Sequence, residues 1–137
     1  MCRRHHWYPN FVALPLVLAL AMLPAIASDT PALDRDEIID LVSEKTTECR
    51  KEKDQSLCSN WFSGDGEIKR IMHADGARKD GRWFIDDRDR LCILWNGKIK
   101  ALCFAVLAQS DGSYHLIKNE RHITTITGFE DGNTQNL

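Results

Sequence analysis

The chain has 137 residues, of which 43% are apolar and 28% are charged. These are the proportions of an ordinary globular protein, and they exclude a disordered, collagen-like or multi-span membrane protein. The 18 basic and 20 acidic side chains give a formal net charge of −2. Because there is no basic excess to neutralise a phosphate backbone, binding to nucleic acid is not expected. The length predicts one small domain.

The N-terminal segment has the pattern of a cleaved signal peptide. Arg3 and Arg4 precede the apolar run Phe11–Leu23, and an Ala-Ile-Ala motif of small residues ends at position 27. A retained membrane anchor is the alternative, but the stretch from Phe11 to Ala27 has 17 residues with two prolines and is shorter than the roughly 20 residues that a span needs. We therefore predict that residues 1–27 are removed, that no stable membrane span remains, and that residues 28–137 work in the periplasm or outside the cell.

Four cysteines follow this segment, an even number that predicts two disulfides in an oxidising compartment. Three pairings are open to them. One pair flanks an Asn-Gly dipeptide between two apolar runs, and the other flanks a polar stretch, so each pair is expected to join the two strands of its own hairpin. Neither C-x-x-C spacing nor a close Cys/His cluster is present, which argues against zinc. The expected bridges are Cys49–Cys58 and Cys92–Cys103.

The second bridge depends on the register of its hairpin. With a two-residue turn at Asn96-Gly97, Cys103 lies diagonal to Cys92, and diagonal neighbours are about 7–8 Å apart, too far for an unstrained bridge. A four-residue loop from Asn96 to Ile99 places Cys92 directly opposite Cys103. This second register is the one we expect.

One helix is predicted over residues 34–44. Asp34 and Glu37 have the spacing of a capping box, and Leu33 and Ile38 stand where a hydrophobic staple has its two apolar partners. The apolar residues that follow form a narrow stripe, so the helix is expected to cover one end of the remaining domain.

The rest of the chain has the pattern of short strands separated by Asp-Gly and Asn-Gly turns. The predicted fold is mainly β: one N-terminal helix, then an antiparallel meander of about eight strands, forming a calycin- or lipocalin-like barrel or a strongly curved sheet. Residues 28–137 form a single domain in this interpretation. The expected strands are Lys45–Cys49, Cys58–Ser63, Glu67–Ala74, Arg82–Asp86, Arg90–Trp95, Lys100–Ala108, Ser113–Lys118 and Arg121–Thr127.

The candidate catalytic and metal-binding residues are few. His115 and His122 fall on one face of a predicted hairpin and are weak candidates for a metal site, but no third ligand is nearby in the sequence. The charged run Asp86–Arg90 lacks the glycine and the ligand spacing of a calcium loop, so a solvated turn is expected. No serine has the setting of a nucleophile, and the thiols are expected to be oxidised. We therefore expect no cofactor and no catalytic role.

Three tryptophans are candidate ligand-binding residues: Trp61, Trp83 and Trp95. Lying on different strands, they could line a cavity inside a barrel, where aromatic walls suit an apolar ligand. They could equally fill the core, and this alternative is favoured because so small a domain needs its aromatic residues for stability. An eight-stranded barrel is just wide enough for either arrangement.

The order of several short motifs resembles a family of small secreted proteobacterial proteins, the domain of unknown function numbered 995. The residues that carry the resemblance are Asp34–Ile38, Trp61-Phe62, Asp80–Asp87, Arg90–Trp95, Cys103 and Gly128–Asn133. The resemblance implies an exported β domain and leaves its activity open. Gly81-x-Trp83 also differs from a lipocalin, in which this motif lies on the first strand rather than the fourth.

The function expected from these features is a non-catalytic binding or envelope-accessory module whose partner is an envelope protein or a small apolar ligand. A lipocalin-like carrier of such a ligand is the first alternative. An envelope hydrolase or hydrolase inhibitor is a less favoured alternative.

Overall fold

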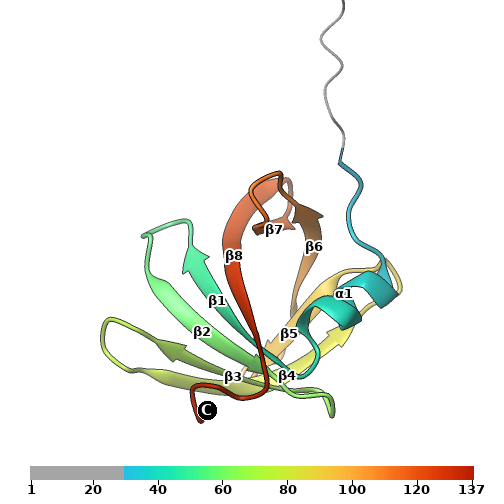
Figure 1. Ribbon diagram of the computed structural model, residues 1–137. Helices are drawn as coiled ribbons and strands as arrows, with labels where there is room; N and C mark the ends of the chain where they lie inside the picture. Colours follow the sequence, from blue (N-terminus) through green and yellow to red (C-terminus); the bar gives the residue numbers. More distant parts are fainter. Residues whose placement is uncertain (1–29) are drawn as a thin grey trace, which may run out of the picture.

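The computed structural model describes residues 30–137, which form one helix and eight strands (Figure 1). The predicted signal peptide, residues 1–27, lies outside the described residues. Within the described part, no helix has the length and apolar character of a bilayer span. The elements are α1 (Arg35–Val42), β1 (Lys45–Lys51), β2 (Leu57–Phe62), β3 (Glu67–Met72), β4 (Arg78–Ile85), β5 (Leu91–Trp95), β6 (Leu102–Ala108), β7 (Tyr114–Lys118) and β8 (Arg121–Asp131).

The eight strands form a closed antiparallel barrel. Each strand pairs with the next one in the sequence, and β1 also pairs with β8, from Lys45 opposite Asp131 to Lys51 opposite Thr124. The predicted mainly β meander is confirmed, and of its two expected forms, a barrel or a strongly curved sheet, the closed barrel is the one observed. In an up-and-down barrel successive connections lie at alternating ends, so the β1–β2, β3–β4, β5–β6 and β7–β8 connections share one end.

Strand alternation sends one row of side chains from every strand into the barrel. The buried apolar cluster contains Phe62 and Ile68, which face each other across β2 and β3, together with residues of all the later strands. Burial of these side chains is the main force that holds the closed form. The cluster is Ile38, Val42, Phe62, Ile68, Trp83, Ile85, Leu91, Ile93, Trp95, Phe104, Val106, Leu116 and Ile126.

Helix α1 covers one end of the barrel (Figure 1). The predicted capping box is present: the Asp34 carboxylate accepts from the Glu37 amide, and the Glu37 side chain accepts from the Asp34 amide. Ile38 and Val42 are fully buried against the core, and the Arg35 guanidinium donates to the carbonyl of Ile85 at the end of β4. This end of the barrel is therefore closed.

The helix ends two residues earlier than the predicted span of 34–44. Ser43 is already extended and serves as the C-cap. Glu44 has a positive φ of 59°, and its amide donates to the carbonyl of Phe62. This left-handed residue turns the chain directly into β1 at Lys45.

Strand β4 is longer than predicted, because Asp80-Gly81, one of the Asp-Gly dipeptides expected to form turns, does not form one. Gly81 lies inside the strand opposite Trp95. A Cβ atom at this position would be 2.5 Å from the carbonyl oxygen of Leu94. The glycine is therefore required by the close approach of β4 and β5, and Arg78 rather than Arg82 begins the strand.

Both predicted disulfides are present, and each joins residues that are directly opposite each other on neighbouring strands. Cys49 faces Cys58 across β1 and β2. Cys92 faces Cys103 across β5 and β6 in the predicted register, although the connection spans residues 96–101 rather than the expected four residues 96–99. Because Leu91 and Ile93 point into the core, alternation places the Cys92–Cys103 bridge on the outer face of the barrel.

Candidate ligand site at the open end of the barrel

The end of the barrel opposite α1 contains a cavity of about 290 Å³. Its floor is apolar, made by Ile93, Phe104 and Leu116 from three successive strands. Its rim includes Lys98 and Lys100, which belong to the β5–β6 connection and so lie at the end away from the helix. The cavity is therefore the part of the barrel interior, at the end away from α1, that side chains do not fill.

Five basic side chains line this cavity, and no aspartate or glutamate is among its described lining residues. The basic side chains come from separate parts of the chain: β1, β3, β4 and the β5–β6 connection. Overlapping positive potentials in a partly enclosed space attract anions more strongly than the same charges on a flat surface. They are Lys51, Arg70, Lys79, Lys98 and Lys100.

Arg70 is the basic residue that lies deepest. Its Nε donates to Asn60 Oδ1 at 2.7 Å, and its guanidinium carbon lies 4.8 Å from the centre of the Trp95 ring. No carboxylate within residues 30–137 forms an ion pair with it. Burial lowers the pKa of Arg70 to about 10, which still leaves the guanidinium charged at neutral pH. A partly buried cation without a counter-ion is a candidate receptor for an anion.

The neighbouring lysines strengthen this field. Lys79 lies directly opposite Arg70 across β3 and β4, and its Nζ is 5.9 Å from the Trp95 ring centre. The pKa of Lys51 is lowered, first by burial and then by repulsion from Lys53, with Arg70 and Lys79 adding to it. This mutual repulsion is energetically unfavourable, and a bound anion would relieve it.

The three candidate tryptophans occupy three different environments. Trp95 lines the cavity. Trp83 is buried near the helix end, where it packs edge-on against Phe62 with ring centres 5.7 Å apart and donates to the carbonyl of Ser63. Trp61 is partly exposed and falls between the inward-pointing Asn60 and Phe62, so alternation puts it on the outer face. The structure therefore brings only Trp95 to the cavity.

No family model, curated protein or solved structure matches this chain. The resemblance to the domain of unknown function numbered 995 accordingly stays a prediction.

His115 and His122 come together on the outer face, but not as a chelating pair. Their rings stack with centroids 3.7 Å apart and an angle of 18° between planes. A ring nitrogen binds a metal in the plane of its ring at about 2 Å, so two stacked rings do not direct their nitrogens at one ion. His122 instead hydrogen-bonds Thr125, whose hydroxyl donates to Glu52.

A bulge accounts for the residues that join these histidines. Simple pairing of β7 with β8 places Thr124 beside the histidines and Thr125 on the opposite face. The register shifts between Leu116 and Ile117, however, so that Leu116 pairs with Thr124 and Ile117 pairs with His122. Thr124 therefore lines the cavity, and Thr125 joins the histidine cluster.

A serine, a histidine and a carboxylate also meet on the outer face. Ser59 Oγ lies 2.8 Å from His73 Nε2, and Glu48 accepts from the same hydroxyl at 2.9 Å. The Glu48 carboxylate is 3.5 Å from that same His73 Nε2. In a catalytic triad the acid holds the other ring nitrogen, so that the histidine is oriented toward the serine. The arrangement here does not have that geometry.

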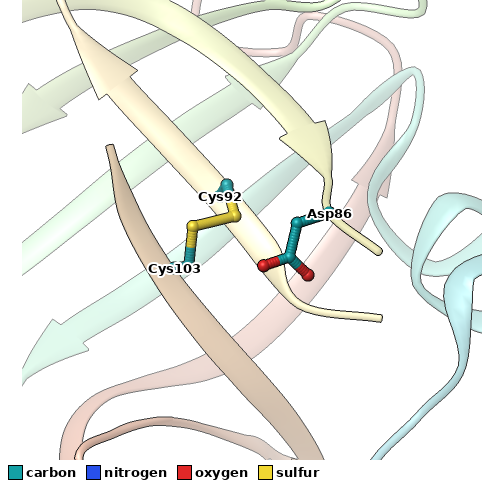
Figure 2. A group of neighbouring side chains, drawn as sticks. All are labelled: Asp86, Cys92 and Cys103. Atoms are coloured by element: carbon teal, nitrogen blue, oxygen red, sulfur yellow. A yellow bond between two sulfur atoms is a disulfide. The ribbon is translucent and has the colours of Figure 1, made fainter. Parts of the chain in front are cut away.

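The group formed by Asp86, Cys92 and Cys103 is the one place in residues 30–137 where three atoms that could ligate a metal lie close together (Figure 2). Its two sulfur atoms are bonded to each other. Asp86 forms a salt bridge with Arg90, with 2.7 Å between Arg90 Nη2 and Asp86 Oδ2, and its carboxylate accepts hydrogen bonds from the backbone amides of Arg88 and Arg90. Burial acts to raise the pKa of Asp86, but these hydrogen bonds outweigh it and the pKa is lowered. The carboxylate therefore stabilises the turn that the sequence predicts here.

The most informative site residues, Arg70 and Asn60, were not identified from the sequence. One signal was available: Arg70 follows Ile68 by two residues, so if Ile68 points inward, Arg70 does too. The same argument applied to Ile71 gives the opposite result, because Arg70 points outward if Ile71 points inward. Only the barrel register, which pairs Arg70 with Asn60 and Lys79, resolves the ambiguity.

Proposed function

We propose that the protein is an exported, non-catalytic, lipocalin-like binding module that holds a small amphiphilic anion in the open end of its barrel. The anionic group of the ligand lies beside Arg70, and its apolar part contacts Ile93, Phe104 and Leu116. This extends the expected apolar ligand by one requirement, a negative charge.

The observation that carries the proposal is the cavity lining: five cations, no described carboxylate, and an apolar floor. An anion supplies the counter-charge that Arg70 lacks, and a guanidinium binds carboxylates and phosphates through two parallel hydrogen bonds. An apolar segment gains from displacing water from the floor. Neither a neutral nor a cationic ligand satisfies both requirements.

The size of the cavity limits the ligand. Its volume of about 290 Å³ lies at the lower limit of the roughly 300–1,000 Å³ that is typical of ligand pockets. Medium-chain carboxylates and small aromatic acids fit this class, whereas long-chain lipids do not fit without an opening of the barrel.

Calorimetric titration with decanoate, together with tryptophan fluorescence, to which Trp95 in the cavity contributes, tests the proposal. Decanoate is expected to bind, and 1-decanol and decyltrimethylammonium to bind far more weakly, because they have the same tail without the negative charge. Replacing Arg70 by methionine should weaken decanoate binding by at least about tenfold, the effect of losing a hydrogen bond to a charged group.

Arg78→Met is the matched control, since Arg78 is exposed and follows the opposite alternation from Lys79. It should leave the affinity unchanged. Equal affinities for decanoate and 1-decanol, or equal affinities of the Arg70 and Arg78 variants, would contradict an anion site at Arg70.

A further inference from the structure

The β5–β6 connection, residues 96–101, carries an exposed apolar side chain between two cations. Ile99 is fully exposed, and its neighbours Lys98 and Lys100 are exposed as well. Ile99 does not line the cavity, although both lysines do. Nothing in the barrel interior therefore accounts for the position of this isoleucine.

This connection differs from the other three at the open end. The β1–β2, β3–β4 and β7–β8 connections each contain at least one acid, among them Glu52, Asp75 and Glu120, whereas residues 96–101 contain none. Leu102, which directly follows this connection, is also partly exposed and lines the cavity together with the two lysines. The β5–β6 side of the rim is thus both basic and apolar.

The opposite end of the barrel has the reverse character. Helix α1 carries Asp36 and Glu37 in its first turn, and the β4–β5 connection contains three aspartates against two arginines. A molecule with one acidic end and a local basic rim takes a preferred orientation toward a negative surface, with the acidic end turned away.

We propose that the loop of residues 96–101 docks the open end of the barrel on an anionic phospholipid surface. Ile99 inserts into the interfacial region, and Lys98 and Lys100 contact the lipid phosphates. An apolar side chain flanked by lysines suits this interface, because lipid supplies an apolar layer directly beneath a layer of negative charge. This docking does not depend on the proposed ligand, although it would place the cavity mouth at the membrane.

A lipid surface accounts for these residues better than a protein partner does. The exposed apolar side chain is single and lies at the tip of a loop, whereas protein interfaces have a packed apolar centre. A protein partner of complementary charge would be the acidic helix end of a second copy, and this alternative predicts self-association.

Co-sedimentation of residues 28–137 with vesicles tests the proposal. We expect binding to vesicles of phosphatidylglycerol and phosphatidylcholine in equal parts, little binding to pure phosphatidylcholine, and a loss of binding at high salt. Ile99→Ser should lower the partition coefficient by at least about tenfold, as the loss of one inserted apolar side chain implies. Phe84→Ser, which removes a different exposed apolar residue, from the outer face of β4, is the matched control and should bind as the parent does.

Two further measurements make the result decisive. Ile99→Ser should keep its melting temperature and its decanoate affinity, whereas Arg70→Met should lose decanoate affinity and keep vesicle binding. The two variants therefore test the docking proposal and the ligand proposal separately. Docking is overturned if the parent does not bind the anionic vesicles at low salt, or if Ile99→Ser and Phe84→Ser bind equally. It is also overturned if sedimentation shows self-association that Ile99→Ser abolishes, which assigns the loop to a second copy.

Discussion

The Arg70 guanidinium is held over the face of Trp95, with 4.8 Å between its carbon and the ring centre. Asn60 fixes its Nε from the neighbouring strand. A guanidinium held by a ring face and an amide oxygen loses little rotamer freedom when it binds, which favours affinity. The two contacts leave its remaining N–H groups available to a ligand.

Lys79 lines the cavity and its neighbour Arg78 does not, so removing each charge in turn tests whether its position matters. Lys79→Ala should weaken decanoate binding up to about fivefold, the effect of one partly screened charge, whereas Arg78→Ala should not change it. Titrations at low and high salt check this, since the difference between the two variants should shrink as salt rises. Equal losses in the two variants would show that net charge, rather than the cavity lining, determines affinity.

Gly81→Ala should destabilise the fold by about 1–3 kcal/mol, the usual effect of overpacking. The new methyl group would meet the backbone carbonyl of Leu94, which cannot move without separating β4 from β5. Gly128→Ala is the control: it lies in a strand too, but its Cβ would make ordinary contact with the Glu48 side chain. Urea denaturation of both variants measures the difference, and equal stabilities would contradict the close-approach argument.

Removal of the Cys92–Cys103 bridge by a double substitution to alanine should lower the free energy of unfolding by about 2–4 kcal/mol. A domain of this size has a small stability margin, so the melting temperature should fall strongly. Reduction also breaks Cys49–Cys58, so a larger loss is expected, and the reduced protein should unfold rather than change function. A reduced protein that keeps its melting temperature would instead favour a redox role for this bridge.

His115 makes stability depend on pH. Its pKa is lowered from 6.5, first by burial and then by repulsion from His122, although Glu52 and Asp111 act to raise it. The unfolded chain therefore binds the proton more readily, so this contribution to stability is complete above pH 6.5 and is lost as the pH falls. The carboxyl of Glu52, whose pKa is lowered from 4.5, acts only at lower pH.

Denaturation between pH 6.5 and 4.5 checks this, and His115→Gln should flatten the slope in that interval. A slope that is equally steep in His115→Gln would assign the pH dependence to other groups.

The sequence determines most of the fold because its signals are local. The capping box at Asp34, the Asn96-Gly97 loop and the two cysteine pairs each involve residues close together in the chain, and all are observed. Asp80-Gly81 misled because the same dipeptide serves a turn and a close approach of strands, and only the position of Leu94 tells them apart.

The cavity could not be predicted in the same way, because its lining comes from distant parts of the chain. Lys51, Arg70 and Lys100 meet only when the barrel closes. Each has the appearance of an ordinary surface charge in the sequence, where Lys and Arg usually are exposed. The bulge between Leu116 and Ile117 likewise moves Thr124 into the cavity lining without any local signal.

The pairing of β1 with β8 also determines how this protein can associate with other chains. Residues 45–51 and 124–131 hydrogen-bond each other, so within the described barrel no strand is left with a free edge. Free edges are where sheets recruit strands from other chains, in peptide capture and in aggregation. Closure removes both options in the described barrel, so recognition by this domain depends on its loops, its outer face and its end cavity rather than on strand addition.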